Sequence, residues 1–297
     1  MQYHSIPQAP FAIISGSAGW GVAFPDGLSE SGVGVVEREL RFDTPWGASD
    51  GWQLLEIDAG LTPDDKPRLV LNVFSHGWPL DAIDHSAHRR VAWVLGQAGA
   101  RKVLADSTCG SLNKALQPRD FLVPSDVIDF SQTQFSLLGG RFQHLCVGAQ
   151  LFCPTLAKTL EATARELWPH PGRVYGLANR LVVAHNWGPR FTSAAEARAY
   201  QLFGADAINQ SIAPEASAMR EIGACFISAT YIVSYEESIV VSGWGGLDTI
   251  HADLAEVASR TSLLAIARAE DSAACGCAAL RTARPPDYAL RAKGSPT

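Results

Sequence analysis

Glycine and hydroxyl-bearing residues follow two predicted strands in the first half of the chain. The run 15–19 (SGSAG) comes directly after the apolar run 11–14, and the run 107–111 (STCGS) follows the apolar run 102–105. Glycines let backbone N–H groups approach an anion, and serine and threonine hydroxyls add further donors. Each run therefore predicts either an oxyanion site or an ordinary tight turn.

A histidine and a polar run lie at two other strand ends. His76 comes directly after the apolar run 68–74, where an imidazole can donate to an anion or cap the strand end. The run 209–215 carries amide, hydroxyl and carboxylate groups between a predicted strand and a predicted helix. Its Glu215 would lie in the first helical turn, where the helix dipole alone explains an acidic residue.

An aromatic residue and a basic cluster give two weaker signals. Phe191 lies in the run 188–193, ahead of a predicted helix, and can stack on a flat base or fill the core. On a helix, His85 and Arg89 share one face because they are four residues apart. This cluster predicts either a chemical role or a solvated helix start.

The segments between these residues alternate in strand and helix character. Segments with strand character occupy residues 11–14, 68–74, 102–105, 121–130 and 224–230. Helical patterns occupy residues 85–97, 155–167 and 248–269. Ser193 and Glu196 form a capping box that begins one more helix. This order predicts an α/β fold around a sheet buried on both faces, with the site at the C-terminal ends of its strands.

The bulk composition excludes several classes of partner. The chain has 297 residues, 47% hydrophobic content and a formal net charge of -6 at pH 7. An acidic chain without long Lys/Arg runs argues against nucleic-acid binding. No stretch of about 20 apolar residues occurs, and residues 1–10 lack the basic start and apolar run of a signal peptide. We therefore expect a cytoplasmic protein with no membrane partner.

The cysteines are scattered through apolar sequence, which is typical of a reduced cytosolic set. They are Cys109, Cys146, Cys153, Cys225, Cys275 and Cys277. Because no CxxC pair and no His/Cys cluster at zinc spacing occurs, no metal site is expected. Cys275 and Cys277, separated by one glycine, are either two free thiols near the C-terminus or a strained redox pair.

Taken in order, these segments resemble the methylthioadenosine phosphorylases of the purine nucleoside phosphorylase superfamily. The resemblance runs from about Ala12 to Glu270. The matching segments are Ile13–Ser17, Phe42–Gly47 (family "DTPFG"), Ser75–Gly77 ("RHG"), Thr108–Leu112 ("ACGSL"), Gln117–Asp120 ("QPGD"), Phe152–Pro154 ("FCP"), Gly188–Ser193 ("GPRFSS") and Gly204–Glu215 ("GAD.IN..TVPE"). Each fragment is short, and their shared order and spacing make the resemblance specific.

The resemblance implies a fold and a reaction. The implied fold is a single α/β domain with a twisted mixed β-sheet flanked by helices, here residues 1–280, with residues 281–297 as a disordered tail. The implied assembly is a homo-oligomer, a trimer or a hexamer, with each active site near a subunit interface. The implied reaction cleaves the glycosidic bond of a purine nucleoside with phosphate as co-substrate, using no metal and no organic cofactor.

The family's functional residues carry over to positions in this chain. The implied phosphate ligands are Ser17, Ser75, His76, Thr108 and Ser211. The implied substrate-binding residues are Cys109, Gly110, His144, Phe191, Gln210, Tyr231 and Val233. Among these, His76, Ser211 and Tyr231 are the expected catalytic residues. His144 would match a histidine that the family supplies from a neighbouring subunit.

Several positions depart from the family pattern. Ser75 replaces a phosphate-binding arginine, and such a charged donor contributes about 1.5–3 kcal/mol. Tyr231 and Val233 replace two aspartates of the family's "ATDYD" stretch, which address the adenine ring. Trp187 replaces a glutamate, and Gln210 replaces a methionine under the ribose. Tyr231 retains one weak donor, whose ordinary pKa is about 10, and can hydrogen-bond a leaving base.

These departures leave three hypotheses for function. The first is a nucleoside phosphorylase with altered base specificity, in which Arg89, Arg90 or Arg190 supplies the missing charge. The second keeps the fold and changes the reaction, for example to nucleoside hydrolysis. The third is a ligand-binding relative without catalysis. Glu236 and Glu237 follow the altered stretch and are expected on the solvated surface, with the alternative that they turn into the base pocket.

Overall fold

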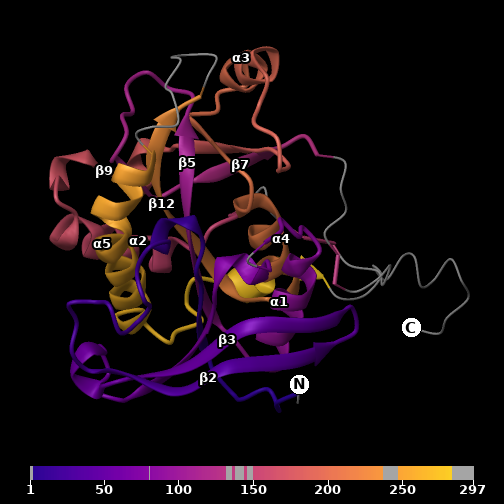
Figure 1. Cartoon of the computed structure of the whole chain (residues 1–297), viewed down its shortest axis with the longest axis vertical. Coiled ribbons are helices and arrows are strands. Elements are labelled where there is room, and N and C mark those ends of the chain that lie inside the picture. Colours follow the sequence, from indigo (N-terminus) through magenta and orange to yellow (C-terminus); the bar gives the residue numbers. More distant parts are fainter. Residues whose placement is uncertain are drawn as a thin grey trace, which may run out of the picture.

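The computed structural model describes residues 3–79, 81–131, 136–137, 144–145, 150–236 and 247–282. Its centre is a mixed sheet of 11 strands among these residues. Helices flank the sheet, as Figure 1 shows. The predicted α/β fold, a single domain with a twisted mixed sheet flanked by helices, is confirmed.

The middle of the sheet consists of four parallel strands. β1 (Phe11–Ile14) lies between β4 (Arg68–Val73) and β5 (Lys102–Ser111), and β12 (Cys225–Tyr235) pairs with the other edge of β5. All four residues of β1 are buried. Parallel strands covered on both faces have continuous apolar sequences, which explains why these runs could be identified from sequence.

Shorter strands extend the sheet on each side. Beyond β4 lies the antiparallel pair β2 (Val33–Thr44) and β3 (Gly47–Ile57). On the other side follow β11 (Ala207–Asn209), β10 (Val182–His185) and β7 (Asp126–Asp129). β6 (Phe121–Leu122) pairs with β12, and β9 (Val174–Tyr175) pairs with β6. A separate two-stranded sheet joins β8 (His144–Leu145) and β13 (Arg281–Thr282).

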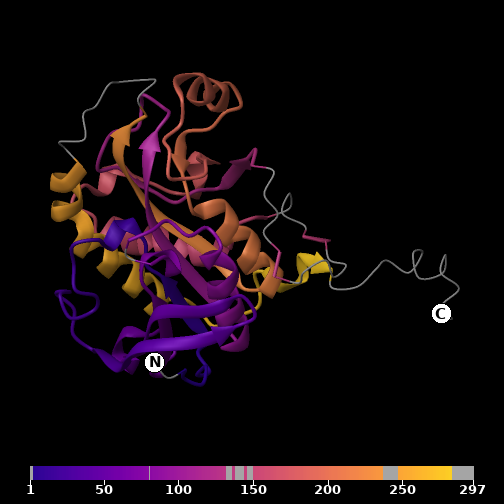
Figure 2. The same cartoon turned by 45° about the vertical axis from the view of Figure 1, so that its right-hand side comes forward.

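Two pairs of helices cover the two faces of the central strands. α1 (Ala87–Gln97) and α4 (Ile212–Ile222) pack together on one face, and α2 (Pro154–Leu167) and α5 (Leu247–Ala267) pack together on the other. Figure 2, turned by 45°, shows the same division. α3 (Ala194–Leu202) begins at the predicted capping box, in which the Ser193 side chain accepts from the Glu196 backbone N–H.

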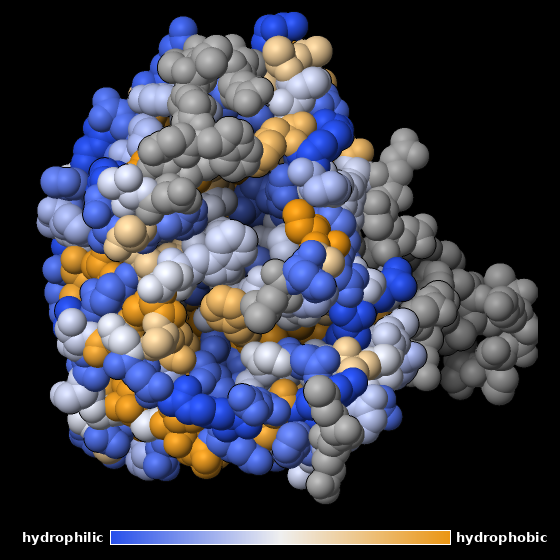
Figure 3. Space-filling model, viewed as in Figure 1, coloured by the Kyte–Doolittle hydropathy of each residue, from blue (hydrophilic) through white to orange (hydrophobic). Residues whose placement is uncertain are grey.

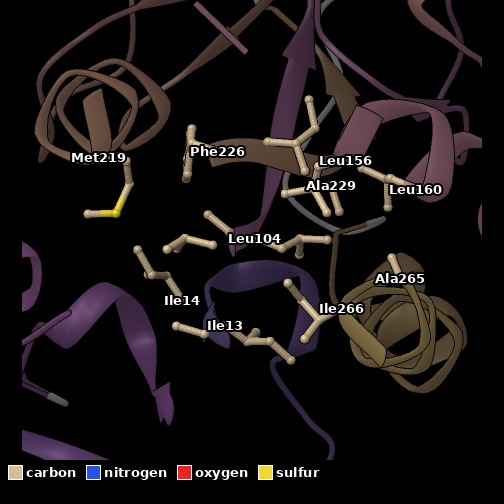
Figure 4. Packing of buried hydrophobic residues seen from close by; sticks show 14 of the residues in the cluster. Ile13, Ile14, Leu104, Leu156, Leu160, Met219, Phe226, Ala229, Ala265 and Ile266 are labelled. Atoms are coloured by element: carbon tan, nitrogen blue, oxygen red, sulfur yellow. The ribbon is translucent and has the colours of Figure 1, made fainter. Parts of the chain in front are cut away.

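Buried aliphatic side chains from both layers fill the space between sheet and helices (Figure 4). The sticks labelled there come from β1, β5, β12 and the covering helices: Ile13, Ile14, Leu104, Phe226, Ala229, Leu156, Leu160, Met219, Ala265 and Ile266. Burial of one such side chain stabilises the fold by about 1.5–3 kcal/mol. This packing fixes the strands whose C-terminal ends carry the polar residues.

The structure corrects three predicted boundaries. β5 does not end at residue 105 but continues to Ser111, so Thr108, Cys109 and Gly110 lie in a strand rather than in a turn. β12 likewise continues past residue 230 to Tyr235. The polar ends remain extended because β5 and β12 pair with each other along this length. The strand predicted at 121–130 is divided into β6 and β7.

The C-terminal end of the predicted domain can be described in part. Arg281 and Thr282, the first residues of the predicted tail, form β13, and the Arg281 guanidinium donates to the Glu221 carbonyl. Residues 283–297 lie outside the described part. None of the described helices is both long and apolar enough to cross a membrane.

Candidate functional site

A cavity of about 480 Å³ opens where several strand ends meet. Its lining comes from segments far apart in the sequence. Some of these segments follow β1, β4 and β10, and the others belong to β5, β11, β12 and α5 or directly follow β11 and β12. The lining includes Ser17, Trp20, Ser75, His76, Trp78, Thr108, Cys109, Gly110, Asn186, Phe191, Thr192, Asn209, Gln210, Ser211, Val233, Ser234, Glu236 and His251. Polar and apolar residues are interspersed on the face of the molecule in Figure 3.

Hydroxyl groups predicted from two separate runs meet in this cavity. The Ser17 and Thr108 side-chain oxygens are 2.8 Å apart and hydrogen-bond each other. The Asn209 amide donates to the Thr108 carbonyl at 2.9 Å, and its Oδ1 accepts from the backbone N–H groups of Ser211 and Ile212 at 2.7 and 2.8 Å. Asn209 therefore caps α4 and holds the positive end of this helix beside the hydroxyls.

His76 and Glu215 form a buried pair beside these hydroxyls. His76 Nδ1 donates to Glu215 Oε1 at 2.6 Å, and both side chains are almost fully buried. Burial lowers the pKa of His76, but the Glu215 charge and hydrogen bond outweigh it, so the net pKa is raised. Burial also raises the pKa of Glu215, against the effect of His76. The pair therefore favours the protonated imidazole at pH values above the ordinary pKa of histidine.

The backbone around His76 brings its other ring nitrogen against the loop after β1. Ser75 and His76 both have left-handed φ angles, of 51° and 56°, and the His76 N–H donates to the Ser15 carbonyl at 2.9 Å. A Cβ added to Gly16 would lie 2.2 Å from His76 Nε2. Only glycine permits this approach, which explains one of the small residues in the run 15–19.

Asp106 holds the loop after β1 by a side-chain hydrogen bond, and this role was not predicted from the sequence. Its Oδ1 accepts from the Gly16 backbone N–H at 2.8 Å, and the side chain is buried. Burial raises the pKa of Asp106 to about 7, although the Gly16 hydrogen bond opposes this shift. Asp106 thus positions Ser17 without lining the cavity itself.

This end of the cavity offers hydroxyls, an imidazole and a helix N-terminus to an anion. No arginine or lysine occurs among the described residues that line it. Arg90 pairs with Asp84 and Arg190 pairs with Glu196, and neither they nor Arg89 reaches the lining. None of the three arginines predicted to replace the family's cation therefore lies in the described lining, and that replacement stays a prediction.

Most of the predicted substrate-binding residues also line the cavity. Cys109, Gly110, Phe191, Gln210 and Val233 are all part of it. Burial raises the pKa of the Cys109 thiol to about 12, so this group is a neutral surface for a ligand. Phe191 is 51% exposed and lies at the cavity, which contradicts a role in the core.

Tyr231 does not line the cavity, in contrast to the prediction that it contacts the base. Its ring packs 5.6 Å from that of Trp168, and its hydroxyl hydrogen-bonds His251 Nδ1 at 3.3 Å. Burial raises the pKa of its hydroxyl. The cause is a register shift in β12 between Ile232 and Ser234. Such a bulge interrupts the alternation of side chains, so Val233 faces the cavity although Tyr231 does not.

His144 lies in β8, opposite Thr282. Its side chain is outside the described part of the structure, so its predicted substrate contact stays a prediction.

Glu236 is a lining residue whose position the sequence predicted wrongly. It is only 5% exposed and lines the cavity, which contradicts a solvated surface position. Its backbone N–H donates to the Ser111 carbonyl at 2.8 Å, so the chain continues along β5 past the end of β12. A Cβ on Gly110 would lie 2.8 Å from Glu236 Oε2. Glycine at 110 therefore makes room for this carboxylate. Glu237 lies outside the described residues.

His251 and Trp20 are further lining residues without a sequence signal. His251 comes from the first turns of α5 and stacks on Trp20 with ring centroids 6.3 Å apart. Its Nδ1 is the partner of the Tyr231 hydroxyl. Tyr231 therefore acts on the cavity through His251 as a positioning residue. A single histidine in a helical pattern does not reveal such a position.

Comparison with known proteins gives one matching family model, described as the phosphorylase superfamily, over residues 71–267. Among curated relatives, the 6-oxopurine nucleoside phosphorylase of Pyrococcus furiosus is 27% identical over 257 residues, covering 81% of this chain and 89% of the relative. The probable 6-oxopurine nucleoside phosphorylase of Thermococcus kodakarensis is 30% identical over 213 residues, covering 68% and 73%. The S-methyl-5'-thioadenosine phosphorylase of Nitrosopumilus maritimus is 27% identical over 212 residues, covering 71% and 76%.

Solved structures agree with the fold. A double mutant of the adenosine/methylthioadenosine phosphorylase from Schistosoma mansoni, in complex with adenine, superposes with a TM-score of 0.70 at 24% identity, covering 92% of this chain and 97% of that one. A methylthioadenosine phosphorylase from an antarctic soil metagenomic library gives a TM-score of 0.68 at 22% identity, covering 89% and 88%.

Proposed function

This chain belongs to the phosphorylase superfamily, and on that premise we propose that it transfers the glycosyl group of a purine nucleoside to phosphate. In this reaction the bond between the anomeric carbon and the purine nitrogen breaks, and a bond from the same carbon to a phosphate oxygen forms. The purine leaves with the electron pair of the broken bond and takes up a proton. The proposal includes phosphate as co-substrate and no organic cofactor.

The observation that carries this proposal is the set of donors at one end of the cavity. Ser17 and Thr108 are hydrogen-bonded to each other, Ser211 begins α4, and His76 is held by Glu215. Preorganised donors hold an anion close to a reacting carbon at little entropic cost. In the proposed complex, Nε2 of His76 and the hydroxyls bind phosphate, and the raised pKa of His76 favours the protonated ring.

The base is proposed to bind where Gly110, Val233 and Glu236 line the cavity. Both kinds of curated relative are named for purines that carry an N–H group at the ring edge, and a carboxylate accepts hydrogen bonds from such a group. Tyr231 and Val233 replace the two family aspartates, and among the described residues of β12 and the segment after it, Glu236 is the acid that lines the cavity. This is the basis for altered base specificity, with methylthioadenosine a poor substrate.

The test is a panel of inosine, guanosine, adenosine and methylthioadenosine, each with and without phosphate. We expect release of free base only with phosphate, together with an equal amount of sugar 1-phosphate. Brisk cleavage of methylthioadenosine would contradict the altered specificity. Base release without sugar 1-phosphate would contradict phosphorolysis.

One observation favours hydrolysis as a second candidate function. The described lining contains no arginine or lysine, and a charged donor contributes about 1.5–3 kcal/mol to a hydrogen bond. A water molecule needs less positive charge than phosphate does, and the His76 ring would accept its proton in the neutral form, at a pH above the raised pKa of His76. Hydrolysis would appear in the same panel as phosphate-independent base release with a free reducing sugar.

A further inference from the structure

Four cysteine side chains converge at the opposite end of β12 from the cavity. Cys225 is the first residue of β12, Cys153 is the N-cap of α2, and Cys275 and Cys277 follow α5. All four Sγ atoms lie within 4.8 Å of one another. Glu236 lies just beyond the far end of this strand of 11 residues, roughly 30 Å away at the rise of an extended chain. The cluster is therefore separate from the proposed active site.

The spacing of the sulfurs suits one tetrahedral metal ion. In a zinc tetrathiolate the Zn–S bond is about 2.3 Å, which puts neighbouring sulfurs about 3.8 Å apart. The observed limit of 4.8 Å applies to all six pairs, so the four sulfurs surround one point rather than forming two separate pairs. Gly276 has a φ of 71°, and this left-handed turn lets the two flanking cysteines face the same centre.

The surroundings suit a buried, negatively charged centre. Lys102 Nζ lies 3.4 Å from Cys225 Sγ, and Lys102 is only 3% exposed. The Gln150 amide donates to Cys277 Sγ at 3.1 Å, and the Thr155 hydroxyl lies 3.1 Å from Cys153 Sγ. One Zn²⁺ with four thiolates has a net charge of about -2, and a buried ammonium with two neutral donors offsets it. Such partners orient the ligands of a metal site.

We propose that Cys153, Cys225, Cys275 and Cys277 bind one structural Zn²⁺ ion. All four coordination positions are filled by the protein, which is typical of a structural rather than a catalytic zinc site. The ion would join the segment after α5 to the starts of α2 and β12. The cysteine spacing did not predict a metal site because the four ligands come from three distant segments.

The first test is the metal content of the full-length protein, purified under reducing conditions without chelators. We expect about one zinc per chain, and less than a tenth of that in Cys225→Ala and in Cys275→Ser. Cys109→Ala is the matched control, because Cys109 is also a buried thiol outside the cluster, and it should retain the zinc.

A second measurement keeps the proposal testable if a variant fails to fold. The wild-type protein, stripped of metal and reduced, should bind one Co²⁺ and develop the thiolate charge-transfer absorption of a tetrahedral site. Zinc should displace the cobalt and raise the thermal midpoint of the stripped protein by about 5 °C or more. The proposal would be overturned if the purified protein contained no zinc and the stripped protein bound no cobalt. Two disulfides among the four cysteines, found in peptides from freshly purified protein, would also overturn it. Stoichiometric iron would overturn the assignment to zinc.

Discussion

Among single residues, His76 has the largest expected effect on phosphate binding. Its ring is held by Glu215 at 2.6 Å, and its other nitrogen faces Gly16. Loss of a charged hydrogen bond costs about 1.5–3 kcal/mol, so His76→Ala should raise the KM for phosphate by about 10- to 100-fold. His170→Ala, at an exposed position, is the control and should leave this KM unchanged. An unchanged KM in His76→Ala would show that the pocket does not bind phosphate.

The same pair predicts a pH dependence. Burial lowers the pKa of His76, but Glu215 raises it to a net value above 6.5, so the imidazolium is present at lower pH and is lost as the pH rises through this raised pKa. Phosphate KM should therefore rise on the alkaline side. Glu215→Gln removes the group that raises the pKa, and burial then dominates. The rise in KM should move to lower pH in this variant, as measured by steady-state profiles of both proteins side by side. Superimposable profiles would contradict the assignment.

Glycine 110 allows a direct test of the base site. A Cβ at this position would lie 2.8 Å from Glu236 Oε2 and 3.3 Å from an Ile208 methyl group. Gly110→Ala should displace the carboxylate and raise the KM for the nucleoside at least tenfold, about 1.4 kcal/mol, with the KM for phosphate nearly unchanged. Gly34→Ala is the control because nothing lies within 4 Å of its added Cβ. Equal effects on both KM values would indicate general damage to the site.

The sequence predicted the anion side of the cavity better than its base side. Ser17, His76 and Thr108 lie directly after or within apolar strands, so their types and positions indicated a shared site. Glu236 and His251 lie in segments whose local pattern is the same for exposed and buried positions. Their place depends on the bulge at Val233 and on the docking of α5, which are tertiary features that one-dimensional patterns do not contain.

At the scale of elements, Asp106 links β5 to the loop after β1. Burial raises its pKa to about 7 from an ordinary value of 3.8, so the folded state binds the proton more tightly than the unfolded state does. Between these two values the free energy of unfolding falls as pH rises, by up to about 1.4 kcal/mol per pH unit. Asp106→Asn keeps an acceptor for Gly16 without this titration.

The measurement for Asp106 is urea unfolding of wild type and Asp106→Asn at several pH values. The variant should gain stability relative to wild type as the pH increases from about 4 to 7, and the difference should be constant above that range. A difference that does not depend on pH would mean that Asp106 is ionised, or protonated, in both states alike.

Helices and strands whose sequence signal is local were predicted best. β1 is a continuous apolar run, β4 is mostly apolar, and the capping box at Ser193 is a four-residue signal, so these were confirmed. The polar ends of β5 and β12 were assigned to turns because hydroxyl residues and glycine are common there. They remain strands because each pairs with the other, which is a contact between residues more than 100 positions apart.

At the scale of the whole molecule, the open side of the cavity leads to a proposal for assembly. Phe191 is 51% exposed and Trp20 is 45% exposed, and both line the cavity. Large exposed aromatic rings beside a ligand site are typical of interaction surfaces. We therefore propose a homo-oligomer, most simply a trimer, in which a neighbouring chain covers this side.

Light scattering at micromolar concentration tests the assembly. A trimer should have a mass of about 95 kDa, compared with 31.8 kDa for one chain. Phe191→Ala tests whether a neighbouring chain covers this ring. If a neighbour covers this ring, the variant should dissociate at higher protein concentration than the wild type does, because burial of an aromatic side chain contributes about 1.5–3 kcal/mol. Leu202→Ala is the control, since Leu202 is exposed and outside the cavity lining. A wild-type monomer with full activity would contradict the proposal, because the cavity would then need no partner to close it.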